Sequence, residues 1–141
     1  MVTPTNVRFP KAVQTALDFF IRRTGERKST VISTAVGEWL KLQDHPQIRF
    51  ISPIPGVRRA ALADGPQVWS IAEAWTQAGE SDRSVDSVAR AIGLRVDQVE
   101  AALSYWADNR EEIDGLIDQV HVTQETEYAA WQRRQALDSV K

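Results

Sequence analysis

Two side chains near the start of the chain are of the types that read the edges of DNA bases. Asn6 and Arg8 alternate with Val7 and Phe9 in the segment TNVRF. A guanidinium forms paired hydrogen bonds with O6 and N7 of guanine, and a carboxamide does so with N6 and N7 of adenine. The pattern therefore favours contact with double-stranded DNA in the major groove. The alternative is that Asn6 and Arg8 are only the solvated face of an edge strand.

A second group of polar residues extends this candidate DNA-binding site. Thr5 or Thr3 adds a hydroxyl beside the base-reading pair, and Lys28, Ser29 and Thr30 stand where a second helix is expected to begin. The first amide groups of a helix have no acceptor within it, so they bind anions well. We expect the start of this helix to hold a phosphate of the DNA backbone.

Residues suited to catalysis are few and scattered. The chain has no cysteine, and its two histidines, His45 and His121, belong to different expected elements. His121 and Glu125 have the i, i+4 spacing of two metal ligands on a helix, but no third ligand accompanies them. The nearest approach to a carboxylate pair is the acidic run Glu111, Glu112, Asp114 and Asp118. Such a run is typical of a solvated helix face, so we expect no enzyme, no bound metal and no cofactor.

The base-reading residues need a strand to carry them. Residues 5–9 alternate polar and apolar with a period of two, which is typical of a half-buried strand. No second strand follows closely enough to form a hairpin with it, so the simplest partner is the same segment of a second chain. The sequence thus predicts a homodimer joined by a two-stranded ribbon, and leaves a higher-order assembly open.

Two short helices are expected behind this strand. Pro10 begins the first, because the missing N–H of proline costs nothing there, and Gly25 ends it as a left-handed cap. Ser29 is expected to cap the second helix, which ends at His45 and Pro46. The apolar faces that recur at helical spacing are Val13, Ala16, Leu17, Phe20 and Ile21 in the first helix, and Val31, Ile32, Ala35, Val36, Trp39 and Leu40 in the second.

This order of elements resembles the ribbon-helix-helix family of repressors and antitoxins. The resemblance lies in NVRFPKAV and in TGERKSTVISTAV. It implies an intertwined dimer whose paired strands enter the major groove, with Asn6 and Arg8 directed at the bases. About 45 residues cannot bury two amphipathic helices alone, which agrees with dimerisation.

The rest of the chain predicts a β-hairpin followed by helices. The expected elements are a strand from Gln47, a turn at Pro53–Gly56, a return strand at Arg58–Leu62, a helix over Val68–Ala78 ended by Gly79, a helix from Ser84 through Ala91, and a long helix from Val96 or Asp97 to at least Ile117. The positions expected to be buried are Val68, Ile71, Ala72, Trp75, Val85, Val88, Ala89 and Ile92. Helix, glycine turn and helix together indicate a helix-turn-helix unit.

This second part is similar to another family, the small actinobacterial helix-turn-helix proteins grouped as a domain of unknown function and often described as VapB-type antitoxins. The resemblance covers roughly residues 45–118 and lies in HPQIRF, PGVRRAALADGPQVW and VDQVEAALSYWADNREEID. Members of that family often carry a longer GTR-type motif where this chain has GPQVW. A role for that motif therefore does not carry over.

The helix-turn-helix unit is a weak candidate for reading DNA. The residues at the start of its last helix are acidic overall and would repel phosphate; they are Asp97, Gln98, Glu100 and Ala101. We favour a role in packing, dimer extension or partner binding over a recognition helix. The basic residues considered for a second DNA contact are Arg58, Arg59, Arg90 and Arg95. Arg58 and Arg59 would point to opposite sides of a strand, so they would not form one patch.

The C-terminal segment ETEYAAWQRRQALDSVK permits a helix with a thin apolar stripe, which either continues the long helix or docks separately. Antitoxins of this general design commonly occupy their toxin with such a segment. An arginine of the antitoxin can then reach the acidic, metal-binding cluster of a PIN-type toxin. Trp131, Arg133 and Arg134 are the candidate toxin contacts. The alternative is a helix packed on its own domain or on its dimer mate.

Charge is distributed unevenly along the chain. The net charge is −2, but residues 1–45 carry seven Lys/Arg against four Asp/Glu, whereas residues 96–141 carry four against ten. A basic head suits DNA, and an acidic tail suits another partner. No apolar leader or membrane span is expected, and the absence of cysteine suits a reducing cytoplasm.

These observations predict a mainly α protein in three parts. Residues 1–45 form the ribbon-helix-helix unit, residues 46–120 the β-hairpin and helix-turn-helix domain, and residues 121–141 a helical tail. The expected function is that of a cytoplasmic, DNA-binding antitoxin that represses its own promoter and neutralises a PIN-like ribonuclease toxin. The alternatives are a ribbon-helix-helix regulator without a toxin and a DNA-organising or partition protein.

Overall fold

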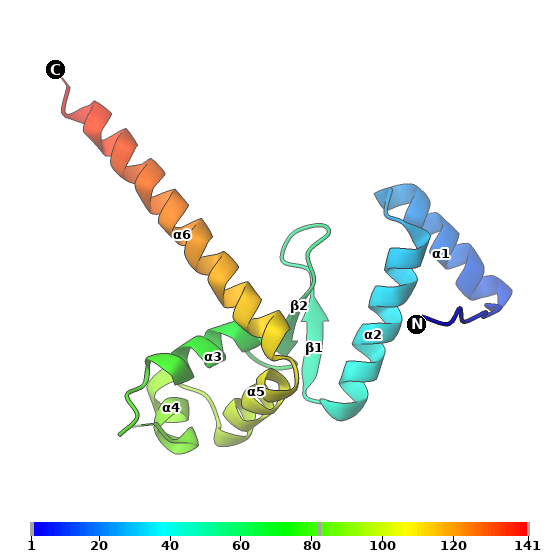
Figure 1. Cartoon of the computed structure of the whole chain (residues 1–141), viewed down its shortest axis with the longest axis horizontal. Coiled ribbons are helices and arrows are strands. Elements are labelled where there is room, and N and C mark those ends of the chain that lie inside the picture. Colours follow the sequence, from blue (N-terminus) through cyan, green and yellow to red (C-terminus); the bar gives the residue numbers. More distant parts are fainter. Residues whose placement is uncertain (1, 82, 141) are drawn as a thin grey trace. The chain divides into compact units, whose positions relative to one another are not determined.

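The computed structural model describes residues 2–81 and 83–140, and within them the chain is mainly helical (Figure 1). Six helices and one two-stranded antiparallel sheet make up its regular structure in these residues. The chain divides into two compact units, Met1–Lys41 and Leu42–Lys141, which are described here in turn.

The first unit contains α1, Lys11–Thr24, and most of α2, Lys28–Asp44. The expected helix end at Gly25 is confirmed, whereas the helix begins at Lys11, one residue later than predicted, with Pro10 at the N-cap position. Gly25 has a left-handed φ of 74°, and its N–H donates to the Ile21 carbonyl at 2.8 Å. The predicted N-cap at Ser29 is wrong, because α2 begins one residue earlier and Ser29 lies inside its first turn.

The segment before α1 has no regular structure in the single chain. The strand predicted at residues 5–9 is absent here, and both strands of the described residues lie in the second unit. A strand needs a neighbour to take up its N–H and C=O groups, and one chain offers this segment none. The ribbon itself therefore stays a prediction.

Neither α1 nor α2 has a buried residue. The expected apolar positions are there, yet many are open to solvent. The large apolar side chains left exposed in this unit are Val2, Val7, Val13, Phe19, Val36, Trp39 and Leu40. The first unit, taken by itself, has amphipathic helices but no closed core.

The second unit opens with a β-hairpin, as predicted. β1, Ile48–Ile51, pairs antiparallel with β2, Arg59–Leu62, with Ile48 opposite Leu62 and Ile51 opposite Arg59. One face of the hairpin carries Ile48, Ala60 and Leu62, all of which are buried. The turn between the strands includes Gly56, whose φ of 80° suits glycine.

Three helices follow the hairpin and bury their apolar faces with it. They are α3, Val68–Gln77, α4, Val85–Ile92, and α5, Val96–Asp108. The Ser84 hydroxyl caps α4 by accepting from the Ser87 N–H, and Gly93 makes the turn to α5 with a φ of 72°. The expected burial of Ile92 is wrong: this side chain, the last of α4, is 37% exposed.

The long helix predicted from Val96 is interrupted. α5 ends at Asp108, Asn109 has φ −133° and ψ 47°, and α6 runs from Arg110 to Asp138. The Asn109 side-chain amide donates to the Tyr105 carbonyl at 2.9 Å, which holds the corner. The tail is thus the continuation of α6 rather than a separately docked segment, and α6 extends well beyond the helices of its unit (Figure 1).

Residues from the hairpin and from all four helices of the second unit meet in one core. Its largest fully buried side chains are Tyr105, Leu62, Ile71, Ile113, Val68 and Val99. In the part of the chain that the structure describes, no helix has both the length and the apolar character needed to cross a membrane.

Replacing Ser84 with alanine tests the start of α4. The variant loses the hydroxyl that accepts from the Ser87 N–H at 3.1 Å. We expect the free energy of unfolding to fall by about 1 kcal/mol, measured by urea denaturation. Ser104→Ala, at an exposed position within α5, is the control and should change it by less than about 0.5 kcal/mol. Equal effects of the two substitutions would contradict the capping role.

Candidate nucleic-acid interface

The residues predicted to contact DNA are all exposed. Thr5, Asn6 and Arg8 lie in the segment before α1, and Lys28, Ser29 and Thr30 form the first turn of α2. No hydrogen bond or ion pair of the described residues joins the two groups. The structure of the single chain therefore shows no direct bond that brings the two groups together.

The start of α2 has the features of an anion site at a helix end. The first intrahelical bond runs from the Val31 N–H to the Arg27 carbonyl at 3.0 Å. The amides of Lys28, Ser29 and Thr30 precede it and have no acceptor within the helix. The positive end of the helix dipole lies at the same place, which favours a phosphate there.

Lys28 already forms an ion pair in the single chain. Its ammonium lies 3.4 Å from the Asp18 carboxylate on α1. The Gln14 amide and the Lys28 ammonium both donate to Asp18, and together they lower the pKa of that carboxyl below its ordinary value. The pair is exposed on both sides, so it is weak and Lys28 can exchange Asp18 for a phosphate.

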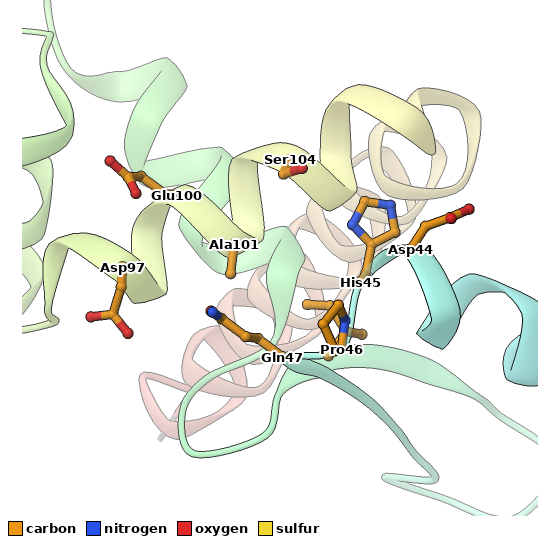
Figure 2. A pocket seen from close by; sticks show the side chains of 9 residues that line it. Asp44, His45, Pro46, Gln47, Asp97, Glu100, Ala101 and Ser104 are labelled. Carbon is orange, nitrogen blue, oxygen red and sulfur yellow. The ribbon is translucent and has the colours of Figure 1, made fainter.

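The exposed face of α5 is acidic and hollowed. Asp97, Glu100, Ala101 and Ser104 line a depression of about 270 Å³ together with Asp44, His45, Pro46, Gln47 and Ile48 (Figure 2). In a helix-turn-helix protein the recognition surface is expected on the second helix of the motif. Here that helix offers carboxylates, which repel the phosphates of DNA.

Arg95, at the start of α5, is neutralised by its neighbours. Its guanidinium lies 2.9 Å from Asp64 and 3.0 Å from Asp97. The Asp64 carboxyl also accepts from the buried Gln98 amide at 3.2 Å. Bonds from Arg95 and then Gln98 hold the pKa of Asp64 below its usual range, and Asp64 and Asp97 raise the pKa of Arg95. Arg95 therefore closes a local network, in which two carboxylates offset the charge that it would offer to a phosphate.

Four further arginines of the second unit, Arg83, Arg90, Arg58 and Arg59, lie in different surroundings. Arg83 donates to the carbonyls of Trp75, Thr76 and Ala78 and so caps the end of α3. Arg90 is exposed on α4. On the hairpin, Arg58 precedes β2 instead of lying on it as predicted, and it donates to the Ser52 hydroxyl. Arg59 donates to the Gln67 side chain.

The sequence reasoning overlooked Arg49. This residue lies on β1, and its Nε donates to the Leu62 carbonyl at 3.2 Å. The alternation of Ile48, Arg49 and Phe50 carried the signal, because a strand that buries the first and third directs the second outward. Arg49 thus belongs with the candidate basic residues of the hairpin.

His121 and Glu125 do not begin a metal site in the described residues. His121 pairs with Glu73 of α3, and no group of three metal-binding side chains occurs in the parts of the chain that are described. Within the acidic run, Glu112 accepts from the Tyr105 hydroxyl and Asp114 from the Trp106 indole, each at 2.7 Å. These two carboxylates attach α6 to α5 instead of lying on a merely solvated face.

The far end of α6 presents an aromatic pair to solvent. Tyr128 and Trp131 stack with ring centroids 5.8 Å apart, and they are 60% and 47% exposed. Arg134, three residues after Trp131, shares its side of the helix, whereas Arg133 falls on the opposite side. The three predicted toxin contacts therefore do not lie on one side of the helix. Trp131 and Arg134 share a side, and Arg133 does not.

Comparison with protein-family models, with curated proteins and with solved structures finds no match to this chain.

The network around Asp64 predicts a pH-dependent stability. The folded chain lowers the pKa of Asp64 below its ordinary 3.8, so the network stabilises the fold above that pH and loses its effect as the pH falls through the lowered value. Asp64→Asn should therefore be less stable than the parent chain near neutral pH and equally stable near pH 2. Urea unfolding at both pH values checks this.

The control is Glu80→Gln, at an exposed position outside the helices. Its stability relative to the parent chain should not depend on pH in this way. A stability difference for Asp64→Asn that is the same at both pH values would refute the assigned role.

Proposed function

We propose that this chain is a DNA-binding antitoxin that works as a homodimer, represses its own promoter and neutralises a PIN-like ribonuclease toxin. The single observation that carries the proposal is that the first unit has two amphipathic helices, an exposed polar segment before them and no buried residue. A unit of this size needs a second copy to close its core.

Pairing of the segment 5–9 with its copy accounts for the missing strand. An antiparallel ribbon would give each segment the hydrogen-bond partner that a single chain lacks. Val7 and Phe9 would then face the helices, and Asn6 and Arg8 would face outward. Phe9 is the only one of these four that is already partly covered in the single chain.

The positive local charge of the first unit supports DNA as the ligand of the face that carries Asn6 and Arg8. Residues 1–41 carry seven Lys/Arg against three Asp/Glu, a much more basic balance than that of the whole chain. Association with DNA draws on such local excess rather than on the net charge of the protein. Asn6 and Arg8 would give sequence specificity by contacting the bases. The start of α2 would position the protein by binding a phosphate of the DNA backbone.

The free end of α6 supports a protein partner. Ile113, near the start of α6, is the one buried residue of this helix, and the aromatic pair farther along is open. Aromatic and arginine side chains are the residues that most often dominate the energy of protein interfaces. In the proposed complex, Trp131 packs on the toxin and Arg134 pairs with its acidic catalytic cluster.

Removing the base-reading side chains tests the DNA part of the proposal. We expect Asn6→Ala with Arg8→Ala to weaken binding to a duplex carrying the promoter of the chain's own gene by about 1–3 kcal/mol per lost contact, with reduced sequence preference. Fluorescence anisotropy measures the affinity, and sedimentation equilibrium verifies that the variant is still a dimer.

Arg95→Ala is the charge-matched control, since Arg95 is already paired with Asp64 and Asp97. It should bind the promoter duplex as the parent chain does. Unchanged binding by the Asn6/Arg8 variant, or a parent chain that is monomeric at micromolar concentration, would overturn the proposed ribbon.

Truncating the aromatic and basic contacts of α6 tests the toxin part. We expect Trp131→Ala and Arg134→Ala each to weaken capture of the protein encoded beside this gene by about 2 kcal/mol, roughly 30-fold. Arg133→Ala, on the opposite side of the helix, is the control and should have little effect. Growth rescue during co-expression with that protein provides the second readout.

If the neighbouring gene encodes no protein that this chain binds, the toxin part of the proposal fails. A ribbon-helix-helix regulator without a toxin is then the function that remains, provided that the promoter duplex is still bound.

A further inference from the structure

The outer face of the hairpin is a second basic surface. The register places Arg49 opposite Ala61 and Ile51 opposite Arg59, so Arg49 and Arg59 are diagonal neighbours on the face turned away from Ile48, Ala60 and Leu62. Diagonal neighbours in an antiparallel pair have their backbones about 7–8 Å apart, within reach of two long side chains on one ligand. The hairpin therefore carries two arginines on the same face, at neighbouring positions of its two strands.

No carboxylate of the described residues pairs with these two guanidinium groups. Arg49 donates to the Leu62 carbonyl at 3.2 Å, and Arg59 donates to the Gln67 side-chain oxygen at 3.4 Å. The Nε of Arg59 has no hydrogen-bond partner among the described residues. Residues 45–63 contain three arginines and no Asp or Glu, although the second unit as a whole is acidic. Both positive charges are thus uncompensated.

Gln67 holds one of these arginines beside an indole. The Gln67 side-chain oxygen accepts from Trp69 Nε1 at 2.8 Å as well as from Arg59. Gln67 also forms an isolated bridge with Ala61, which fixes its backbone against β2. The position of the Arg59 guanidinium is therefore set by the fold, which lowers the entropy lost when it binds a ligand.

Two arginines next to the helix ends, Arg95 and Arg83, differ in this respect. Arg95 is paired with two carboxylates, and Arg83 is committed to three carbonyls at the end of α3. The exposed face of α5 is lined by Asp97 and Glu100. Within the second unit, a polyanion is attracted to the hairpin and repelled by the helix that a helix-turn-helix protein would use.

We infer that the outer face of the hairpin, through Arg49 and Arg59, binds the phosphate backbone of double-stranded DNA without reading its sequence. The inference rests on the proposed function, because it gives the same protein a second contact with its DNA. Guanidinium groups match phosphate in geometry and keep their charge at every physiological pH. Backbone contacts of this kind add affinity and position the protein but carry no base preference.

The test compares two duplexes, one with the promoter of the chain's own gene and one of random sequence, over a series of salt concentrations. Each phosphate contact contributes about 0.9 to the slope of log K against log salt. We expect Arg49→Gln with Arg59→Gln to reduce that slope by about two and to weaken binding to both duplexes equally, on the order of tenfold or more near 0.1 M salt.

Two further variants separate charge from folding. Arg49→Lys with Arg59→Lys keeps both charges while losing the guanidinium hydrogen bonds, and it should retain most of the slope. Arg90→Gln removes one exposed charge from α4 and should leave the slope unchanged. Thermal unfolding of each variant verifies that the second unit is folded.

The outcomes distinguish this inference from the proposed function. If the Gln variant keeps the parent slope while Asn6→Ala with Arg8→Ala loses promoter binding, the hairpin inference is refuted and the ribbon stands. If the Gln variant loses affinity for both duplexes while the ribbon variant binds normally, the hairpin is the DNA contact and the ribbon proposal fails. Weaker capture of the neighbouring gene's protein by the Gln variant, with DNA binding unchanged, would assign this face to a protein and overturn the inference.

Discussion

Packing around the ring of Tyr105 is the interaction on which the second unit depends. The side chain is fully buried on α5, and the rings of His45 and Phe50 meet it edge-on with centroids 5.1 and 6.2 Å away. Its hydroxyl donates to Glu112 on α6. One residue thus ties the hairpin, α5, α6 and the segment before β1 together. Edge-to-face aromatic contacts and a hydrogen-bonded buried hydroxyl both stabilise this arrangement. A displacement of the hairpin or of α6 relative to α5 would break these contacts.

This arrangement also determines where charge is available. Because α6 turns back at Asn109, the carboxylates of its first turns meet the aromatic donors of α5 and are used in packing. The N-terminus of α5 meets Asp64, and that contact neutralises Arg95. Among the described residues, no carboxylate pairs with Arg49 or Arg59 on the outer face of the hairpin, or with Arg8 in the first unit. The proposed contacts with DNA follow from that division, as does the free aromatic end of α6.

Much of the architecture could be predicted because its causes are local. Pro10 and Gly25 bound α1, Ser84 caps α4, and the alternation of Ile48, Arg49 and Phe50 marks β1. The break at Asn109 could not be predicted, since the helical periodicity continues through it and the cause is packing on α5. The pairing of Arg95 with Asp64 could not be predicted either, because the two residues lie far apart in the sequence. Arg49 is different, since the local alternation already marks its side chain as directed outward.

The types and periods of the elements could be predicted from the local sequence: two amphipathic helices after a polar–apolar segment, then a hairpin and a helix-turn-helix unit with a helical tail. These follow from φ preferences, end caps and the spacing of apolar residues, all of which act within a few positions. Which charged side chains have a partner of opposite charge depends on the tertiary structure. That Arg95 reaches Asp64 while Arg49 meets no carboxylate depends on contacts between residues tens of positions apart, and such contacts leave no mark in the local pattern.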